Sequence, residues 1–185
     1  NREIPRFLFA YYLINDAMVT VIYFTAIFMK ATFGLSMQEI LILSLLFQII
    51  AIPSTIFFGW LGDRWNPRAT IYLTLTIWVL VLALMGFADG EHAPTAIAIT
   101  LGLVLGSTQS LLRSMYSRMI PPDQAGEYFG FHALVGRASS ALGPLLFGLV
   151  STLAASQRLA MMSMGLFLLA GAILLAKVQL VGKDQ

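Results

Sequence analysis

Short polar turns divide this chain of 185 residues into six apolar runs. A helix that crosses a bilayer needs about 20 apolar residues, because the hydrocarbon core is about 30 Å thick. The expected spans are residues 7–28, 37–60, 69–88, 95–119, 123–153 and 156–177, with Asp123 as the N-cap of the fifth. We therefore expect an all-α membrane protein with six transmembrane helices.

Composition supports this class and argues against others. The chain is 58% hydrophobic and 11% charged, whereas soluble domains are about 25% charged. It has no cysteine, so it can hold neither a disulfide nor a thiolate metal site. No basic stripe indicates nucleic-acid binding, and no nucleophile–base set or phosphate loop indicates an enzyme. We expect no cofactor and no metal.

The turn between the second and third spans is charged and contains two glycines. Asp63, Arg64 and Arg68 are costly to place in hydrocarbon, so the chain leaves the membrane here and re-enters it. Gly59 and Gly62 allow the two helix ends to approach closely.

The distribution of basic residues predicts an orientation. Six crossings place both termini on one side, and that side carries eight basic residues against two on the other. By the positive-inside rule the termini are expected to be cytoplasmic, in the inner or plasma membrane if the source is bacterial. The eight are Arg2, Arg6, Arg64, Arg68, Arg113, Arg118, Lys177 and Lys183, and the two are Lys30 and Arg158.

Polar side chains divide the spans into two kinds. The third and sixth spans are almost wholly apolar, which predicts outer helices that face lipid. The order is two polar spans and one apolar span, twice, which predicts a 3+3 repeat over residues 5–90 and 94–180. Because three crossings are an odd number, the second repeat would be inverted, as in many transporters. A similar spacing in the two repeats agrees with this prediction: Gly59 precedes Arg68 by nine positions, and Gly148 precedes Arg158 by ten.

The turn Gly59-x-Leu61-Gly62-Asp63-Arg64-x-x-x-Arg68 resembles the signature loop in each half of the major facilitator superfamily. It departs from that pattern at Asn66-Pro67, where a small and a basic residue are common. Further stretches are similar to the C-terminal half of the branch that contains autophagy-related vacuolar amino-acid effluxers and bacterial relatives. These stretches are residues 12–16, 106–114, 120–122, 127–131 and 143–148.

The resemblance implies that residues 1–185 are one six-helix half of a twelve-helix secondary carrier. The partners would be the lipid bilayer, an N-terminal half of the same polypeptide, and a small substrate such as an amino acid moved by alternating access. The start at Asn1, without methionine, also suggests a longer polypeptide. The isolated half could form a homo-oligomer. The alternative is a non-transporting scaffold or receptor module, in which the polar residues only join helices.

Two charged residues inside spans are the first candidates for transport. Asp16 in the first span and Arg137 in the fifth are expected at similar depths. Intramembrane charges need a partner, water or a proton. We expect the two to face one cavity and to pair, directly or through substrate. The alternative is an ion pair that only fixes helix packing.

Other polar residues extend the candidate set. Asn15 and Gln109 could bind a zwitterion or join helices, and His132 could carry a proton or simply pack against the backbone. Arg113 and Glu127, with Arg118, are expected to form a surface ion cluster or a gate.

The resemblance gives Asp63 a gating role as well, against a helix N-terminus of the other half. Gly102-x-x-x-Gly106 predicts close helix packing. Gly136, Gly143, Pro144 and Gly148 predict a kink in the fifth span, with either a packing role or a bending role.

Overall fold

The computed structural model describes residues 3–179, which form helices joined by short turns. Six segments of this part are long and apolar enough to cross a membrane, which confirms the six predicted spans. Arg2 and Lys183 of the charge count lie outside the described residues. The elements are α1 (Glu3–Phe33), α2 (Met37–Arg64), α3 (Pro67–Phe87), α4 (Ala93–Ser117), a 3-10 turn η1 (Pro122–Gln124), α5 (Ala125–Ala138), α6 (Leu142–Leu153) and α7 (Gln157–Ala176).

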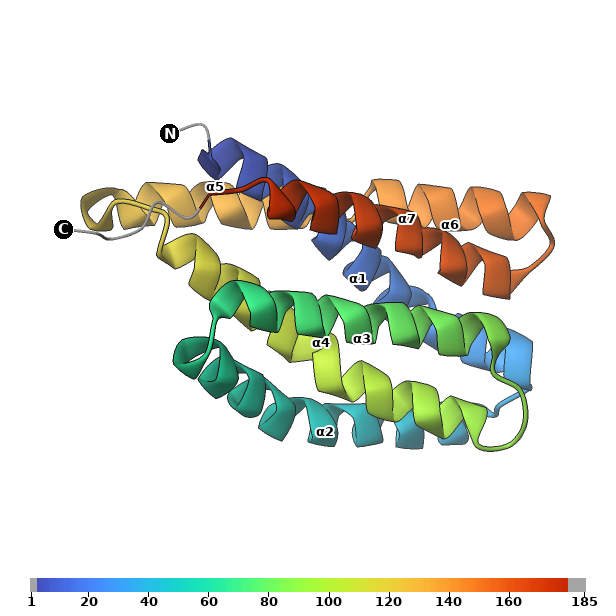
Figure 1. Ribbon diagram of the computed structural model, residues 1–185. Coiled ribbons are helices and arrows are strands. Elements are labelled where there is room, and N and C mark those ends of the chain that lie inside the picture. The colour runs from blue at the N-terminus through green and yellow to red at the C-terminus, as the bar shows by residue number, and fades with distance from the viewer. Residues whose placement is uncertain (1–2, 180–185) are drawn as a thin grey trace.

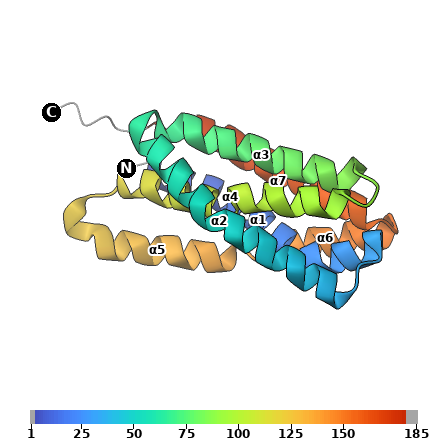
Figure 2. The ribbon, with the colours of Figure 1, turned by 90° about the horizontal axis from the view of Figure 1, so that it is seen from below.

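The central helices are α1 and α4, which are the most buried of the spans. In Figure 2, α3 and α7 lie along one edge of the bundle and α5 lies along the opposite edge, with α1 and α4 between them. The third and sixth spans therefore form an outer pair at one edge of the bundle, although they are more buried than the second and fifth spans. That they face lipid stays a prediction. The start of α1 and the end of α7 lie at one end of the bundle, together with the α2–α3 and α4–α5 connections (Figure 1). The α1–α2, α3–α4 and α6–α7 connections lie at the other end.

Side-chain caps start α2 and α3. Ser36 and Glu39 form a capping box, in which Ser36 Oγ accepts from the Glu39 amide at 3.3 Å and the Glu39 carboxylate accepts from the Ser36 amide at 2.8 Å. Asn66 Oδ1 accepts from the amides of Arg68 at 2.9 Å and Ala69 at 3.2 Å, and Pro67 opens the helix. Asn66-Pro67, where this turn differs from the signature loop, therefore forms the start of α3.

Two arginines hold the outer pair together. Arg68 donates to Leu175 O at 2.6 Å and to Ala176 O at 2.9 Å, at the end of α7. At the other end of the bundle, Arg158 donates to Gly86 O at 3.2 Å and to Ala88 O at 2.9 Å, at the end of α3. Carbonyls at a helix C-terminus lack partners within the helix, and a cation there is favourable.

Small residues bring α2 and α4 into close contact. A Cβ at Gly102 would stand 2.8 Å from the carbonyl oxygen of Phe47, and one at Gly106 would overlap the hydroxyl of Thr55. Ser54 donates across the same interface to Leu103 O at 2.6 Å. The predicted packing motif is therefore confirmed.

The outward face of α2 is apolar, which corrects the expectation that this span presents a polar face. Its one amide in this region, Gln48, donates back to Ser44 O of its own helix at 3.1 Å. The exposed side chains are instead large and hydrophobic: Ile42, Leu45, Ile49, Ile52, Ile56, Phe57 and Trp60.

The fifth span is two helices, not one. α5 ends at Ala138 and α6 begins at Leu142. Pro144 explains the break, because its ring excludes the carbonyl four residues earlier and it has no amide to donate. The span starts through η1 and Gln124, so the expectation that Asp123 is its N-cap is wrong. The predicted kink is a complete interruption.

Candidate functional site

A cavity of about 630 Å³ lies between α1, α4 and α5, in the half of the bundle that contains the termini. It is on the side of the bundle away from α3 and α7. Its volume is in the range of small-molecule sites, about 300–1,000 Å³. Four of the five predicted site residues line it. The lining is Tyr11, Asn15, Val19, Gly106, Gln109, Ser110, Arg113, Phe129, His132, Ala133, Gly136 and Arg137.

The charge of this cavity is positive. Arg113 from α4 and Arg137 from α5 both line it, and its lining contains no carboxylate. The Arg113 guanidinium lies over the ring of Phe129, 5.4 Å from its centroid. Guanidinium groups bind carboxylates through paired, charge-assisted hydrogen bonds. The arrangement therefore suits an anionic group.

Aromatic rings form one wall. The imidazole of His132 stacks on Tyr11, with ring centroids 4.1 Å apart, and also contacts Tyr116 at 5.0 Å. Gly136 leaves room for Tyr11, because a Cβ there would stand 2.9 Å from the tyrosine hydroxyl oxygen. Sequence reasoning missed Tyr11, since a tyrosine in an apolar run carries no signal of its own.

Asp16 does not line the cavity. Its side chain is fully buried, and Oδ2 accepts from the amide of Gly143 at 2.9 Å, at the start of α6. Arg137 is exposed and forms no ion pair in the part of the chain that the structure describes. The expected direct pair between Asp16 and Arg137 is therefore wrong, because successive residues on α1 face in different directions.

Asn15 and Asp16 instead bind the two sides of the break between α5 and α6. The Asn15 amide donates to Gly136 O at 3.3 Å and to Ser139 Oγ at 2.7 Å, at the end of α5. Asp16 accepts from Gly143 on the other side. A broken helix leaves carbonyls at one end and amides at the other without partners, and inside a membrane each must be satisfied. On α1, Asn15 supplies a donor for the carbonyl end of α5, and Asp16 supplies an acceptor for the amide end of α6.

The predicted gating residues lie apart. Asp63 accepts from Arg118 Nη2 at 2.8 Å, which joins the end of α2 to the end of α4. Arg113 faces the cavity, and Glu127 forms no ion pair among residues 3–179. The expected surface cluster of Arg113, Arg118 and Glu127 does not form among the described residues, because Arg118 pairs with Asp63 while Arg113 lies over Phe129 in the cavity.

The signature turn is held by packing as well as by charge. The Arg64 guanidinium lies over Trp60, 5.5 Å from the ring centroid. A Cβ at Gly62 would stand 2.6 Å from Leu111 Cδ2, whereas one at Gly59 would meet open space. Of the two glycines, only Gly62 thus lies against α4, and a side chain there would displace the end of Leu111.

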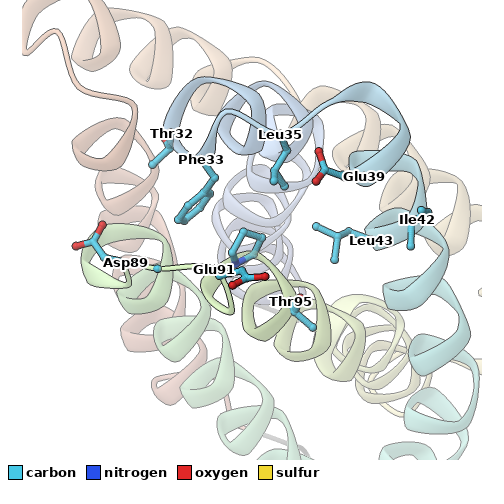
Figure 3. Close-up of a pocket in the computed structure, with 11 residues that line it drawn as sticks. Thr32, Phe33, Leu35, Glu39, Ile42, Leu43, Asp89, Glu91 and Thr95 are labelled. Atoms are coloured by element: carbon cyan, nitrogen blue, oxygen red, sulfur yellow. The ribbon is translucent and has the colours of Figure 1, made fainter.

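A second pocket, of about 620 Å³, lies at the opposite end, where the α1–α2 and α3–α4 connections meet (Figure 3). Glu39, Asp89 and Glu91 line it. Glu39 belongs to the capping box of α2, and Asp89 accepts from Arg158 Nη2 at 2.6 Å. Two of its three carboxylates therefore stabilise the fold, and none of the candidate residues is there.

These features define one half of a major facilitator transporter, an integral membrane protein that crosses the bilayer several times. The fold agrees with the crystal structure of an auto-inhibited POT family peptide transporter, with a TM-score of 0.77 at 17% identity, over 100% of this chain and 40% of that one. The chain belongs to the family described as "Vacuole effluxer Atg22 like", whose model matches residues 1–183.

Similar proteins are known from bacteria and fungi. The chain is 27% identical to the uncharacterised MFS-type transporter YxiO of Bacillus subtilis, over 96% of this chain and 41% of that protein. It is 26% identical to autophagy-related protein 22 of Saccharomyces cerevisiae, over 81% of this chain and 30% of that protein. The chain thus spans less than half the length of these relatives.

Proposed function

We propose that this chain forms one half of a secondary carrier that moves a small solute with a carboxylate group by alternating access. The substrate binds in the cavity between α1, α4 and α5. One observation carries the proposal: Arg113 and Arg137 converge with Asn15 and Gln109 on one cavity whose lining has no acidic residue.

An amino acid fits the chemistry of this cavity. Its carboxylate would accept from Arg113 and Arg137, in charge-assisted bonds. Its ammonium group would donate to the amide oxygens of Asn15 or Gln109, and its side chain would lie against the aromatic wall. Family membership supports a transport function, because the matching family is described as a vacuole effluxer.

The second half of the site would come from the rest of the polypeptide. The cavity is on the side of the bundle that α3 and α7 leave uncovered, and the similar transporters are more than twice as long as this chain. Rocking of the two halves about the site would expose it to each side in turn. By the positive-inside rule, the termini of this half face the cytoplasm.

Flux measurements test the proposal. The full-length protein is reconstituted in proteoliposomes and offered a panel of radiolabelled amino acids and other small carboxylates. Arg113→Gln and Arg137→Gln should each weaken substrate binding roughly tenfold or more, since a hydrogen bond to a charged group contributes about 1.5–3 kcal/mol. Lys30→Gln is the matched control, because it removes the same charge at the other end of α1.

The outcomes separate carrier from scaffold. Saturable flux that the arginine variants reduce and Lys30→Gln leaves intact supports the carrier. Flux of no solute under any gradient, together with specific binding of another protein, would favour the scaffold or receptor alternative. Equal affinity in the arginine variants and the parent would move the substrate site elsewhere.

A further inference from the structure

The two arginines of the cavity between α1, α4 and α5 come from different depths of the bundle. Arg113 is in the last two turns of α4, where its guanidinium lies over the ring of Phe129. Arg137 follows Phe129 by eight residues on α5, so its backbone lies about 12 Å deeper, at about 1.5 Å per residue. Both side chains line the cavity, which therefore has one cationic group near each of two levels.

Contacts between α1 and α5 show the same two levels. Tyr11 stacks on His132 with ring centroids 4.1 Å apart, and one helical turn deeper the Asn15 amide donates to Gly136 O at 3.3 Å. Arg137 follows Gly136 directly, so its backbone lies at the depth of Asn15. Because α1 and α5 run in the same direction from the end that contains the termini (Figure 1), the deeper level is further inside the bundle.

The lining between the two arginines is small or uncharged. Gly106, Ser110 and Ala133 carry no bulky side chain, and Gln109 is the one longer side chain that α4 adds there. None of these four residues carries a charge. The middle of the cavity can therefore hold a short, uncharged carbon chain whose two ends lie near the two arginines.

The cavity offers charged donors but no charged acceptor. Each arginine has five N–H donors and no acceptor, and neither donates to any group among residues 3–179. The amide nitrogen of Asn15 is already bonded to the end of α5, which leaves its oxygen, like that of Gln109, as a neutral acceptor. No carboxylate is among the lining residues of the described part of the chain.

The charge of the substrate follows from this set of groups. A solute with one carboxylate would leave one of the two arginines without an anionic partner. The ammonium group of a neutral amino acid would add a third positive charge to the cavity, and like charges repel. Two carboxylates would balance both guanidinium groups, each through paired, charge-assisted hydrogen bonds. The cavity therefore favours a dicarboxylate over a neutral zwitterion.

We propose that the substrates are short dicarboxylates, acidic amino acids among them, with one carboxylate bound by Arg113 and the other by Arg137. The inference rests on the proposed carrier function and narrows its substrate class. The carbon chain between the carboxylates lies along the small residues of the lining. In an acidic amino acid, the ammonium group donates to the amide oxygen of Gln109.

Ligand pairs of equal size test the number of carboxylates. The full-length protein in detergent is titrated by calorimetry with succinate and with succinamate, its monoamide, and likewise with glutamate and glutamine. The members of each pair have nearly the same shape and differ by one negative charge. The dicarboxylate should bind about tenfold or more tightly than its partner, equivalent to about 1.4 kcal/mol. Equal affinities within the pairs overturn the proposal.

Arginine variants test which residues bind the second carboxylate. In Arg113→Gln and in Arg137→Gln, the ratio of succinate affinity to succinamate affinity should fall toward one, because a single guanidinium group remains. Arg113→Lys should keep part of the ratio, since the charge stays while the planar fork is lost. Lys30→Gln, at an exposed lysine near the other end of α1, is the matched control and should keep all of it. An unchanged ratio in both arginine variants contradicts the assignment of the two carboxylates.

The proposed function and this inference fail in different ways. If the arginine variants weaken succinate and succinamate by the same factor, the cavity remains the substrate site and the dicarboxylate class is wrong. If the arginine variants bind both ligands as the parent does, the substrate site itself lies elsewhere. Thermal melting identifies a variant that has not folded, and in that case the ratio measured on the parent protein still decides the substrate class.

Discussion

Arg68 and Arg158 each bind the C-terminal end of the helix that carries the other arginine. Each is the second residue of an outer helix, α3 for Arg68 and α7 for Arg158, and each donates to carbonyls at the end of the other helix. The two contacts lie at opposite ends of one antiparallel pair. This reciprocity is what an inverted 3+3 repeat would produce, and we propose that the two arginines occupy equivalent positions in its two halves.

Loss of either arginine should destabilise the outer pair. Arg68→Ala and Arg158→Ala should each cost about 1.5–3 kcal/mol, because a charged donor is lost and carbonyls at a helix end lose their partners. Lysine should rescue poorly, since one ammonium group lacks the planar fork of arginine. Thermal unfolding in detergent gives the measurement. Arg64→Ala, which removes only a contact with Trp60, is the control, and equal stability of all four proteins would contradict this role of the two arginines.

Glycine should matter at position 102 and not at position 59. Gly102→Ala forces a Cβ against the backbone oxygen of Phe47, whereas the same change at Gly59 enters open space. Overpacking of this kind costs about 1–3 kcal/mol. We expect a lower melting temperature for Gly102→Ala and an unchanged one for Gly59→Ala. The opposite order would mean that α2 and α4 are not in this close contact.

The ion pair between Asp63 and Arg118 should affect rate rather than stability. The two side chains are 71% and 47% exposed, and exposed pairs contribute about 0–1 kcal/mol. If the pair breaks and reforms as the halves rock, Asp63→Asn should change the maximal rate of transport and leave KM unchanged. A double-mutant cycle with Arg118→Gln isolates the coupling between the two. A higher KM at an unchanged rate would place Asp63 in substrate binding instead.

Single cysteines should report the orientation of the bundle. The chain has no cysteine of its own, so Gln124→Cys and Glu91→Cys, in connections at opposite ends, can each carry the only thiol in a cysteine-free full-length background. In intact cells, a membrane-impermeant maleimide should label Glu91→Cys and not Gln124→Cys, if the termini are cytoplasmic. Labelling in the reverse pattern would invert the proposed topology.

The spans were predictable because bilayer thickness fixes their length and hydropathy marks them. The boundaries were less so: the first helix continues from Phe28, its expected end, to Phe33. Polar composition also located the central helices. It placed α3 and α7 at the edge of the bundle. It misjudged α2, because the Gln48 amide donates to a carbonyl of its own helix and the exposed face of α2 is apolar.

The candidate site was predicted as a set of residues but not as a geometry. Asn15, Gln109, His132 and Arg137 do line one cavity. The error concerned Asp16, because counting along a helix gives depth and not direction, and adjacent residues point about 100° apart. Gly143-Pro144 signalled a kink, but sequence alone did not show which residues of α1 would meet it.

The contacts of Asn15 and Asp16 with the two half-helices make the order of these residues meaningful. Asn15→Asp combined with Asp16→Asn would leave mass, net charge and hydropathy the same. It would nevertheless turn a negative oxygen toward the carbonyl of Gly136, acceptor against acceptor, and leave a neutral group at the amide of Gly143. Two chains of identical composition would therefore differ in whether the interrupted span is tolerated inside the bilayer.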